Sequence, residues 1–283
     1  MLHWFIWNGK NSLSDFGLWI SKLPKITRPN ERYEEITIPG REGTLLTLEG
    51  ENVYESYLKE CVVVVPCDHD LQGILNWLRG SGDIVFSNEI DKAYTGRIAN
   101  EVSFERIGNS LQQATIPFFV KPFKKQRNPE IITVTGSGTI RNIGDVKSKP
   151  LVSITTYGDA EITIAGQTMT FSNVENTINI DCDAEIITTQ AEAYNDAAYY
   201  YKGDYAIFTE NSIQKLYKFT ESGIGATLVS GGKREEVEWD GQPFKYAWHG
   251  IFTGEFWKIP KGESTVTSDI PESITIDPQW RWV

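Results

Sequence analysis

The residues whose types could support chemistry are few, and their spacing is poor. Cys67, Asp68, His69 and Asp70 follow one another directly, and each type can bind a metal ion. Structural zinc sites use spaced pairs of ligands, because four consecutive side chains cannot all reach one ion without a strained backbone. We therefore interpret the run as a turn in which Asp68 or Asp70 caps a following helix, and we predict no metal site.

Catalytic patterns are also missing from the sequence. There is no G-x-S-x-G pattern, and only three histidines could act as a base. Residues 136–138 (GSG) lack the lysine and the helix of a phosphate loop, so they predict a turn. Neighbouring carboxylates such as Asp181 with Asp183 are common in any acidic protein. We predict that the chain is not an enzyme, has no catalytic residues and needs no cofactor.

The segment 190–248 is unusually rich in aromatic residues. Flat aromatic faces with a polar edge suit carbohydrate stacking and protein contacts. The same rings could instead form the core of a small β subdomain, because a fold below ~70 residues needs many large side chains. Both interpretations stay open. The candidate glycan contacts are Tyr199, Tyr201, Tyr205, Tyr217, Trp239 and Trp248.

Composition and charge narrow the classes of function. The 283 residues include 27 Lys and Arg against 38 Asp and Glu, a net charge of -11. This balance argues against specific nucleic-acid binding and against an anionic membrane surface. Three cysteines do not make a disulfide framework and fit a reducing cytoplasm. We expect no signal peptide in MLHWFIWNGK and no membrane span.

The elements that would position these residues are mostly strands. In residues 1–130, Trp4–Trp7 predicts a strand, Asn8-Gly9 a hairpin turn, and SDFGLWI a further strand. The run Val62–Val65 predicts a strand buried on both faces. One helix is expected, because the apolar residues Leu71, Ile74, Leu75 and Leu78 recur at helical spacing. The Lys- and Arg-rich stretch up to Pro129 is interpreted as a linker.

From Ile131 onward, short Thr- and Ile-rich strands alternate with Gly and Asn turns about every ten residues, which predicts a β-sandwich or small barrel. The fold class is therefore mainly β (α+β). We expect one domain over 1–130, a second over 131–189 and 249–283, and an inserted β subdomain over 190–248.

The segment EEITIPGREGTLL (34–46) predicts a hairpin. Pro39-Gly40 fits a type II turn, and Arg41 and Glu42 place opposed charges at its tip. The apolar side chains of its strands belong to Ile36, Ile38, Leu45, Leu46 and Leu48. A lone two-stranded hairpin is marginal in water, so these side chains must pack on something.

Several ordered segments carry a family resemblance. WNGKNSLSDFGLWI, EEITIPGREGTLL, ILNWLRGSGDIVF and AYTGRIANEVSFERI together resemble the distal tail protein family of long-tailed bacteriophages, over nearly all of residues 1–135. IRNIGDVKSKPLVSITTYGDAEITIAGQ and IPKGESTVTSDIPESITIDPQWRWV look like the two ends of that family's galectin-like β-sandwich. The segment 190–248 lies where the family has a short connection, and AAYYYKGDYAIFTENSIQKLYKF is loosely similar to chitin-binding-type modules.

The resemblance implies a structural protein. Its N-terminal β-sandwich-like domain with one helix would form a homo-hexameric ring at the tail tip. The ring would join the tail tube protein to a tail-tip hub or tail-associated lysin protein and to a receptor-binding protein, and its lumen would pass DNA. The chain would assemble in the bacterial cytoplasm and reside in the virion. No catalytic residues are carried over.

Two hypotheses follow from these observations. The first is the ring scaffold, in which Pro39, Gly40, Arg41 and Glu42 reach a neighbouring subunit. The alternative for the hairpin is that it lies over its own domain with both charges solvated. The second hypothesis is a carbohydrate-binding protein, in which the aromatic insert adheres to a host-surface glycan.

Overall fold

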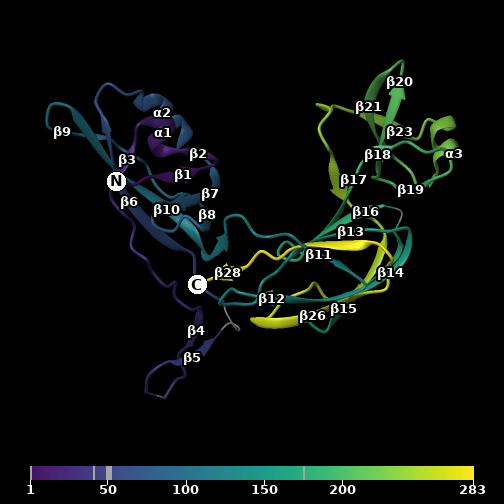
Figure 1. The fold of residues 1–283 in the computed structure, drawn as a ribbon, viewed down its shortest axis with the longest axis horizontal. Helices are drawn as coiled ribbons and strands as arrows, with labels where there is room; N and C mark the ends of the chain where they lie inside the picture. The colour runs from purple at the N-terminus through teal and green to yellow at the C-terminus, as the bar shows by residue number, and fades with distance from the viewer. Residues whose placement is uncertain (1, 41, 49–52, 175) are drawn as a thin grey trace. The chain divides into compact units, whose positions relative to one another are not determined.

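The structure is a computed structural model that describes residues 2–40, 42–48, 53–174 and 176–283. The chain forms two compact units (Figure 1). Unit 1 comprises Met1–Pro129, Gly144–Val146 and Trp280–Val283, and unit 2 comprises Glu130–Ile143 and Lys147–Gln279. Both units consist mainly of strands, which confirms the mainly-β fold class. No helix of the described residues is long and apolar enough to cross a membrane.

Unit 1 is built on one nine-stranded sheet with the path β2-β1-β7-β8-β10-β6-β3, and β9 and β28 also pair with β10. Its elements are β1 (Phe5–Trp7), β2 (Lys10–Asn11), α1 (Ser12–Phe16), β3 (Trp19–Lys22), β4 (Tyr33–Ile36), β5 (Leu45–Leu48), β6 (Tyr57–Pro66), α2 (Leu71–Trp77), β7 (Ser81–Phe86), β8 (Lys92–Ile98), β9 (Glu105–Ile107), β10 (Leu111–Gln126) and β28 (Arg281–Trp282). The long strand β10 thus connects four neighbours.

The first hairpin forms as predicted, with Asn8 at φ 47° and Gly9 at φ 81°. The next segment differs from the prediction, because SDF belongs to α1 rather than to a strand. The side chain of Asn11 accepts hydrogen bonds from the backbone of Leu13 and Ser14, and Gly17 ends the helix at φ 62°. These local caps outweigh the apolar character of the segment.

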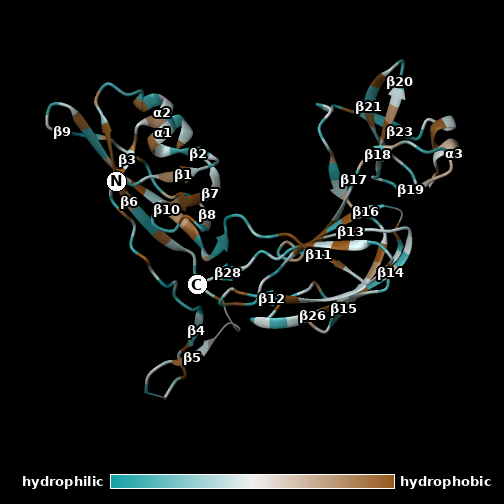
Figure 2. Cartoon of the chain, viewed as in Figure 1, coloured by the Kyte–Doolittle hydropathy of each residue, from teal (hydrophilic) through white to brown (hydrophobic). Residues whose placement is uncertain are grey.

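The core of unit 1 lies between the sheet and the two helices. Of the run Val62–Val65 in β6, Val63, Val64 and Val65 are buried as predicted, whereas Val62 is only half-buried. Helix α2 begins at the expected cap, since the Asp70 carboxylate accepts a hydrogen bond of 3.0 Å from the backbone of Gly73. The Trp77 ring stacks on Phe16 of α1 at 4.2 Å. Figure 2 shows that hydrophobic residues concentrate in the strands rather than in the connecting loops.

The end of the chain belongs to unit 1. Strand β28 pairs with β10, so that Trp282 lies opposite Lys124 and Arg281 opposite Lys125. The Lys92 ammonium lies 3.4 Å from the centre of the Trp282 ring. We expected the last residues to complete the second domain and Lys124 and Lys125 to lie in a linker. The structure instead places both lysines inside β10, because β8 and β28 pair with it there.

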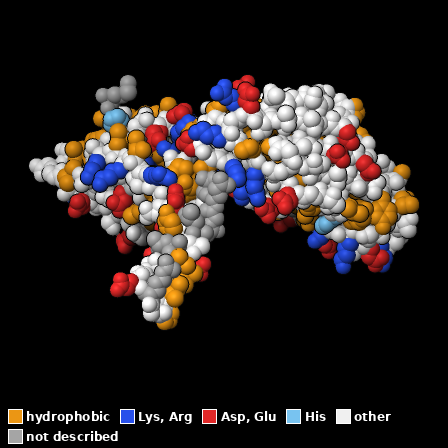
Figure 3. All heavy atoms as spheres, turned by 90° about the horizontal axis from the view of Figure 1, so that it is seen from below, with side chains coloured by type: hydrophobic (Ala, Val, Ile, Leu, Met, Phe, Trp, Pro, Cys, Tyr) orange, Lys and Arg blue, Asp and Glu red, His pale blue; other side chains and the backbone are white. Residues whose placement is uncertain are grey.

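Strands β4 and β5 form the expected hairpin, with Tyr33 opposite Leu48 and Ile36 opposite Leu45. Residues 37–44 connect the strands, and Gly40 has φ 81°, as a type II turn requires. Arg41 lies outside the described residues. Ile36 and Ile38 are each 38% exposed and Leu45 is 37% exposed. Figure 3 shows the hairpin as a projection that carries hydrophobic side chains.

Unit 2 contains two larger sheets with the paths β11-β27-β13-β16-β17-β24 and β12-β26-β14-β15-β25. Their strands are β11 (Ile132–Thr135), β12 (Ser137–Asn142), β13 (Leu151–Thr155), β14 (Gly158–Ile164), β15 (Gln167–Val174), β16 (Thr177–Asp181), β17 (Ile186–Gln190), β24 (Lys245–Ala247), β25 (Ile251–Gly254), β26 (Gly262–Ser268) and β27 (Ser273–Asp277). Burial alternates along most strands of both sheets, so each sheet turns an apolar face inward as in a sandwich.

The insert forms its own small sheets between β17 and β24. These consist of β18 (Glu192–Ala193), β20 (Tyr205–Glu210), β21 (Ile213–Phe219) and β23 (Arg234–Val237), with a separate pair β19 (Tyr199–Tyr200) and β22 (Gly223–Ile224) and one helix α3 (Gly225–Ser230). Phe208, Tyr217, Phe219 and Leu228 are buried in its core. Because β24 pairs with β17, Tyr246 and Trp248 lie on the sandwich side of the boundary rather than in the insert.

Candidate functional site

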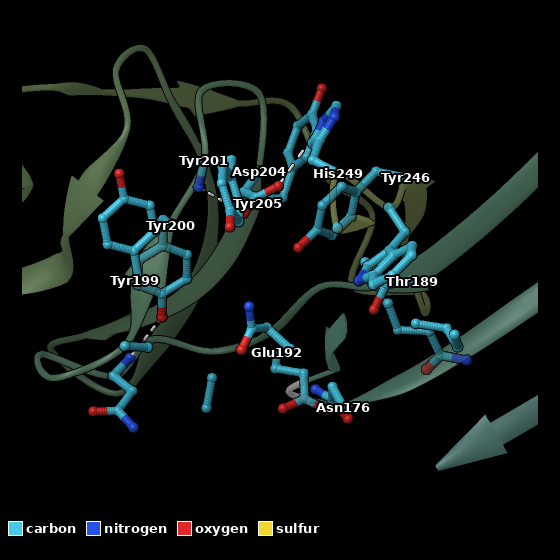
Figure 4. A pocket seen from close by; sticks show the side chains of 18 of the residues that line it. Asn176, Thr189, Glu192, Tyr199, Tyr200, Tyr201, Asp204, Tyr205, Tyr246 and His249 are labelled. Carbon is cyan, nitrogen blue, oxygen red and sulfur yellow. Dashed lines mark hydrogen bonds and ion pairs between the residues drawn. The ribbon is translucent and has the colours of Figure 1, made fainter. Parts of the chain in front are cut away.

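A cavity of about 450 Å³ opens in unit 2 where the insert meets the edge of the sandwich (Figure 4). We call its two sides the insert wall and the sandwich wall. The insert wall comprises Glu192, Tyr199, Tyr200, Tyr201, Asp204 and Tyr205. The sandwich wall comprises Tyr157, Asn173, Asn176, Thr189, Tyr246, Trp248 and His249. The cavity therefore depends on residues that lie up to about a hundred positions apart in the chain.

Strand alternation decides which tyrosines of the insert wall are available. The Tyr200 ring stacks on Phe219 at 4.3 Å, and its hydroxyl accepts a hydrogen bond from the backbone of Asn195. Tyr199 points to the other face of the short strand β19 and is 45% exposed. Its ring meets that of Tyr201 edge-on at 5.2 Å. The pair Tyr199 and Tyr201 thus forms an exposed aromatic rim.

A tight turn at residues 201–204 fixes part of this wall. The Asp204 carboxylate accepts a hydrogen bond of 2.8 Å from the backbone of Tyr201, and Gly203 adopts φ 102°. Burial raises the pKa of Asp204, while the hydrogen bond from Tyr201 and the nearby His249 oppose that rise. One Asp204 oxygen lies 3.9 Å from Nε2 of His249 on the other wall.

The sandwich wall is held by the pairing of β24 with β17. Tyr246 lies opposite Thr189, and the backbone of Trp248 donates to the carbonyl of Ile187 at 3.0 Å. Tyr246 and Trp248, two residues apart, therefore face the same side of the strand. The Trp248 ring lies over Gly250, where any Cβ would clash with it. Burial raises the pKa of Tyr246.

Two contacts join the walls. The rings of Tyr205 and Tyr246 lie 5.1 Å apart, and Asp204 faces His249. Figure 4 shows Tyr205 and Tyr246 close together, with the Asp204–His249 pair beside them. The insert is therefore fixed against the sandwich by the same residues that line the cavity.

Four of the six candidate glycan contacts line this cavity, namely Tyr199, Tyr201, Tyr205 and Trp248. Tyr217 does not, because it lies in the insert core with its ring 4.9 Å from that of Phe208. Its position on β21 points inward, which corrects its assignment to a binding face. Trp239 does not line the cavity either, and its indole N–H donates to the carbonyl of Gln242 at 2.6 Å.

Sequence reasoning missed Asp204, Tyr246 and His249 as members of the cavity. A usable signal existed for Tyr246, which alternates with Trp248 in KYAWH as strand residues do. Asp204 follows Gly203 in a turn, which is typical of a structural aspartate. Nothing local indicated that His249 would face Asp204, because that contact spans 45 residues.

The chemistry that the cavity offers is recognition rather than reaction. It presents aromatic rings, hydroxyls, side-chain amides and carboxylates, and no cysteine is among its described lining residues. Burial raises the pKa of the Cys61 and Cys182 thiols to about 12, so neither is a ready nucleophile. Within the described ranges, no group of three or more His, Cys, Asp or Glu side chains could hold a metal ion.

The hairpin is the second candidate site. Pro39, Gly40 and Glu42 of its tip are exposed. The charge pair proposed there involves Arg41, which lies outside the described residues, so its contacts are not described. The apolar side chains of β4 and β5 whose exposure is described remain partly uncovered within the single chain.

Comparisons with known proteins place the fold. No protein-family model matches the chain, and no curated protein matches it. Among solved structures, the chain is similar to the crystal structure of the SPP1 Dit (gp 19.1) protein, which is described as a paradigm of the hub adsorption apparatus in phages that infect Gram-positive bacteria. The two share 12% sequence identity at a TM-score of 0.57, and the alignment covers 98% of each chain. The likeness shows that the chain has a Dit-like fold.

Proposed function

We propose that this protein is a structural component of a phage tail hub. The observation that carries the proposal is the extent of the likeness to SPP1 Dit, which covers 98% of both chains. A sandwich alone is shared by proteins of many functions, so a match to one domain would carry little weight. A match that runs through both units and their connections is far more specific.

In this role the protein forms a hexameric ring between the tail tube and the tail-tip hub with its receptor-binding apparatus, and DNA passes through the lumen. The ring resides in the virion and is assembled in the host cytoplasm. A cyclic ring needs head-to-tail contacts, in which two different patches of one subunit fit each other. The hairpin supplies one such patch, through Pro39, Gly40, Arg41 and Glu42 at its tip and the exposed Ile36 and Leu45 on its strands.

Native mass spectrometry and negative-stain imaging of the purified chain test this function. We expect a six-subunit species and ring-shaped particles at micromolar concentration. A chain that stays monomeric up to its solubility limit would contradict the ring. The family resemblance motivates this stoichiometry, and the full-length likeness supports the hub role.

The hairpin contact has its own test. Replacing Ile36 with Ser removes an apolar side chain that is 38% exposed, so it should weaken assembly and leave the monomer folded. Reversing the charge of Arg41 with Arg41→Glu should act in the same direction, because opposed charges fix register. Ile213→Ser, at an exposed position of the insert, is the matched control. Wild-type oligomer distributions in both hairpin variants, measured by mass photometry, would place the hairpin outside the interface.

A second function is favoured by the cavity, namely adhesion to a host-surface glycan. Tyr199 and Tyr201 expose 45% and 42% of their surface at its rim, where a folded monomer without a ligand would gain by covering them. A pull-down with purified host cell wall tests it, comparing the full chain with a variant in which a short Gly-Ser turn replaces residues 192–243 and leaves β24 paired with β17. Equal retention of both proteins would exclude adhesion through the insert.

A further inference from the structure

We propose that the cavity between the insert wall and the sandwich wall is a binding site for an uncharged saccharide and that it rejects acidic glycans. The proposal rests on the second function above and specifies its ligand and its location. It differs from a general aromatic platform on the insert, because it excludes Trp239 and Tyr217 and requires residues of the sandwich.

The aromatic faces come from separate elements around one opening. Tyr199 and Tyr201 stand at the rim on the insert side, and Tyr157, between β13 and β14 of the sandwich, is 77% exposed. Tyrosine rings have an apolar face for the C–H side of a sugar and a hydroxyl at the edge. The cavity volume of about 450 Å³ lies in the usual range of ligand pockets. A sugar residue can thus lie between rings of both walls.

The polar lining suits hydroxyl groups, which both donate and accept hydrogen bonds. Asn173 and Gln190 offer amide donors and acceptors, and Glu192 offers a carboxylate that only accepts. Thr189 is already engaged, because its hydroxyl donates to the carbonyl of Thr177 at 3.0 Å. Such a mixture of donors and acceptors matches a polyol better than a purely apolar ligand.

The charge of the lining sets the selectivity. The described lining residues include the carboxylates of Glu192 and Asp204 and neither Lys nor Arg. The one group that could carry positive charge, His249, faces Asp204 at 3.9 Å. A ligand carboxylate or phosphate would therefore meet like charge without a partner, which costs about 1 kcal/mol at 4 Å in water and more where water is excluded.

Three cations of the insert are paired with carboxylates away from the cavity lining. Lys215 contacts Glu236 at 2.9 Å, Lys233 contacts Glu221 at 2.7 Å, and Arg234 contacts Glu210 at 3.1 Å. All three arise from the β21–β23 part of the insert rather than from the cavity lining. They are engaged and offer an acidic glycan no free partner at this opening. Lys202 follows Tyr201 in the chain and the Lys218 ammonium lies 5.7 Å from the centre of the Tyr205 ring, but neither lysine lines the cavity.

The test uses the full chain and pairs of glycans of matched length that differ in charge at one substituent of each sugar. A glycan array is probed first. Binding of galactotetraose is then compared with that of tetragalacturonic acid by saturation-transfer NMR. N-acetylated chitotetraose is compared with its deacetylated form in the same way. We expect uncharged glycans to bind and tetragalacturonic acid to bind at least tenfold more weakly than galactotetraose. The proposal fails if no uncharged glycan on the array binds, or if acidic or amine-bearing glycans bind best.

Point variants locate the site with the best uncharged glycan of the array. Tyr199→Ala on the insert wall and Tyr157→Ala on the sandwich wall should each weaken binding at least fivefold, and Glu192→Lys should relax the rejection of tetragalacturonic acid. Trp239→Ala is the matched control and should bind as the wild type does. Loss of binding in Trp239→Ala with full binding in the two tyrosine variants would move the site off the cavity, while glycan adhesion itself would stand.

Discussion

Lys59 is a charged side chain inside unit 1, with only 3% of its surface exposed. Its ammonium donates to the carbonyl of Lys25 at 2.8 Å and lies 4.5 Å from the centre of the Tyr94 ring. Burial lowers the pKa of Lys59 to about 8, although Glu89 opposes that change, and Lys124 adds to it. Lys59 thus connects the segment after β3 to the sheet, and burial of its charge opposes this contact.

This arrangement predicts a distinctive pH dependence. Between pH 8 and about 10.5 the unfolded chain holds a proton on Lys59 that the folded chain has lost, so the free energy of unfolding rises with pH in that window. Lys59→Met removes the effect. The stability of the wild type relative to this variant should increase by on the order of 2 kcal/mol from pH 7.5 to pH 10, as measured by urea unfolding. A constant difference would contradict a lowered pKa.

Tyr217 and Tyr199 show how much one position along a strand matters. Tyr217 packs in the insert core, and its hydroxyl lies 3.3 Å from carboxylate oxygens of Glu210 and Glu236. Tyr217→Ala should destabilise the insert by ~3 kcal/mol, because it opens a cavity among large rings. Tyr217→Phe keeps the ring and should cost about 1 kcal/mol or less. Hydrogen exchange of the insert amides measures the stability loss in both variants. Equal losses in Tyr217→Ala and Tyr217→Phe would show that the hydroxyl, rather than the ring, stabilises the insert.

At the scale of elements, local signals were the reliable ones. The Asn8-Gly9 turn, the Asp70 cap of α2 and the spaced sandwich strands could all be predicted, because each depends on neighbouring residues. The turn predicted at 136–138 is confined to Gly136, because Ser137 and Gly138 belong to β12. Helix α1 was missed, since five residues are too short for a periodic pattern to outweigh apolar content. Its signal was the cap at Asn11.

Long-range contacts account for most of what the sequence left open in the candidate site. In the sequence, the edge strand β24 belongs to the aromatic segment. Only its pairing with β17 assigns Tyr246 and Trp248 to the sandwich. The cavity exists because two segments meet across that boundary. Which aromatic side chains would be buried and which exposed depended in turn on strand register, which a single sequence specifies weakly where both faces carry rings.

The boundary suggests where the insert can be removed. The backbone of Ala191 donates to the carbonyl of Phe244 at 2.9 Å, so the chain enters and leaves the insert side by side. Replacing residues 192–243 with a short Gly-Ser turn should leave β17 and β24 paired and the sandwich folded. We expect a cooperative thermal transition and the same oligomer distribution as that of the full chain.

A matched variant sharpens this test. Removing residues 190–248 also removes β24 and uncovers the edge of β17, so it should aggregate or unfold at lower temperature than the 192–243 variant. Loss of the cooperative transition in the 192–243 variant itself would show that the insert is part of the sandwich core.

At the scale of the whole molecule, the last residues of the chain complete the first unit. Trp280 is buried, and β28 adds to the edge of the sheet beside β10. Truncation after Gln279 should lower the free energy of unfolding of unit 1 by on the order of 3 kcal/mol, through the loss of a buried tryptophan and of the Lys92–Trp282 contact. Hydrogen exchange should show the loss in β10 and not in β14 or β15. Trp282→Phe is the mild control, and protection lost equally in both units would contradict the assignment of β28.

Residues that precede unit 2 in the sequence and residues that follow it belong to unit 1, so unit 2 is an insertion in the sequence of unit 1. A ribosome must therefore synthesise the whole of unit 2 before the sheet of unit 1 can receive its final strand. A tension applied to unit 2 would likewise be carried by the polypeptide at both of its ends, so a single protease cut in one connecting segment would not detach it. Unit 2 therefore has two independent covalent attachments to unit 1.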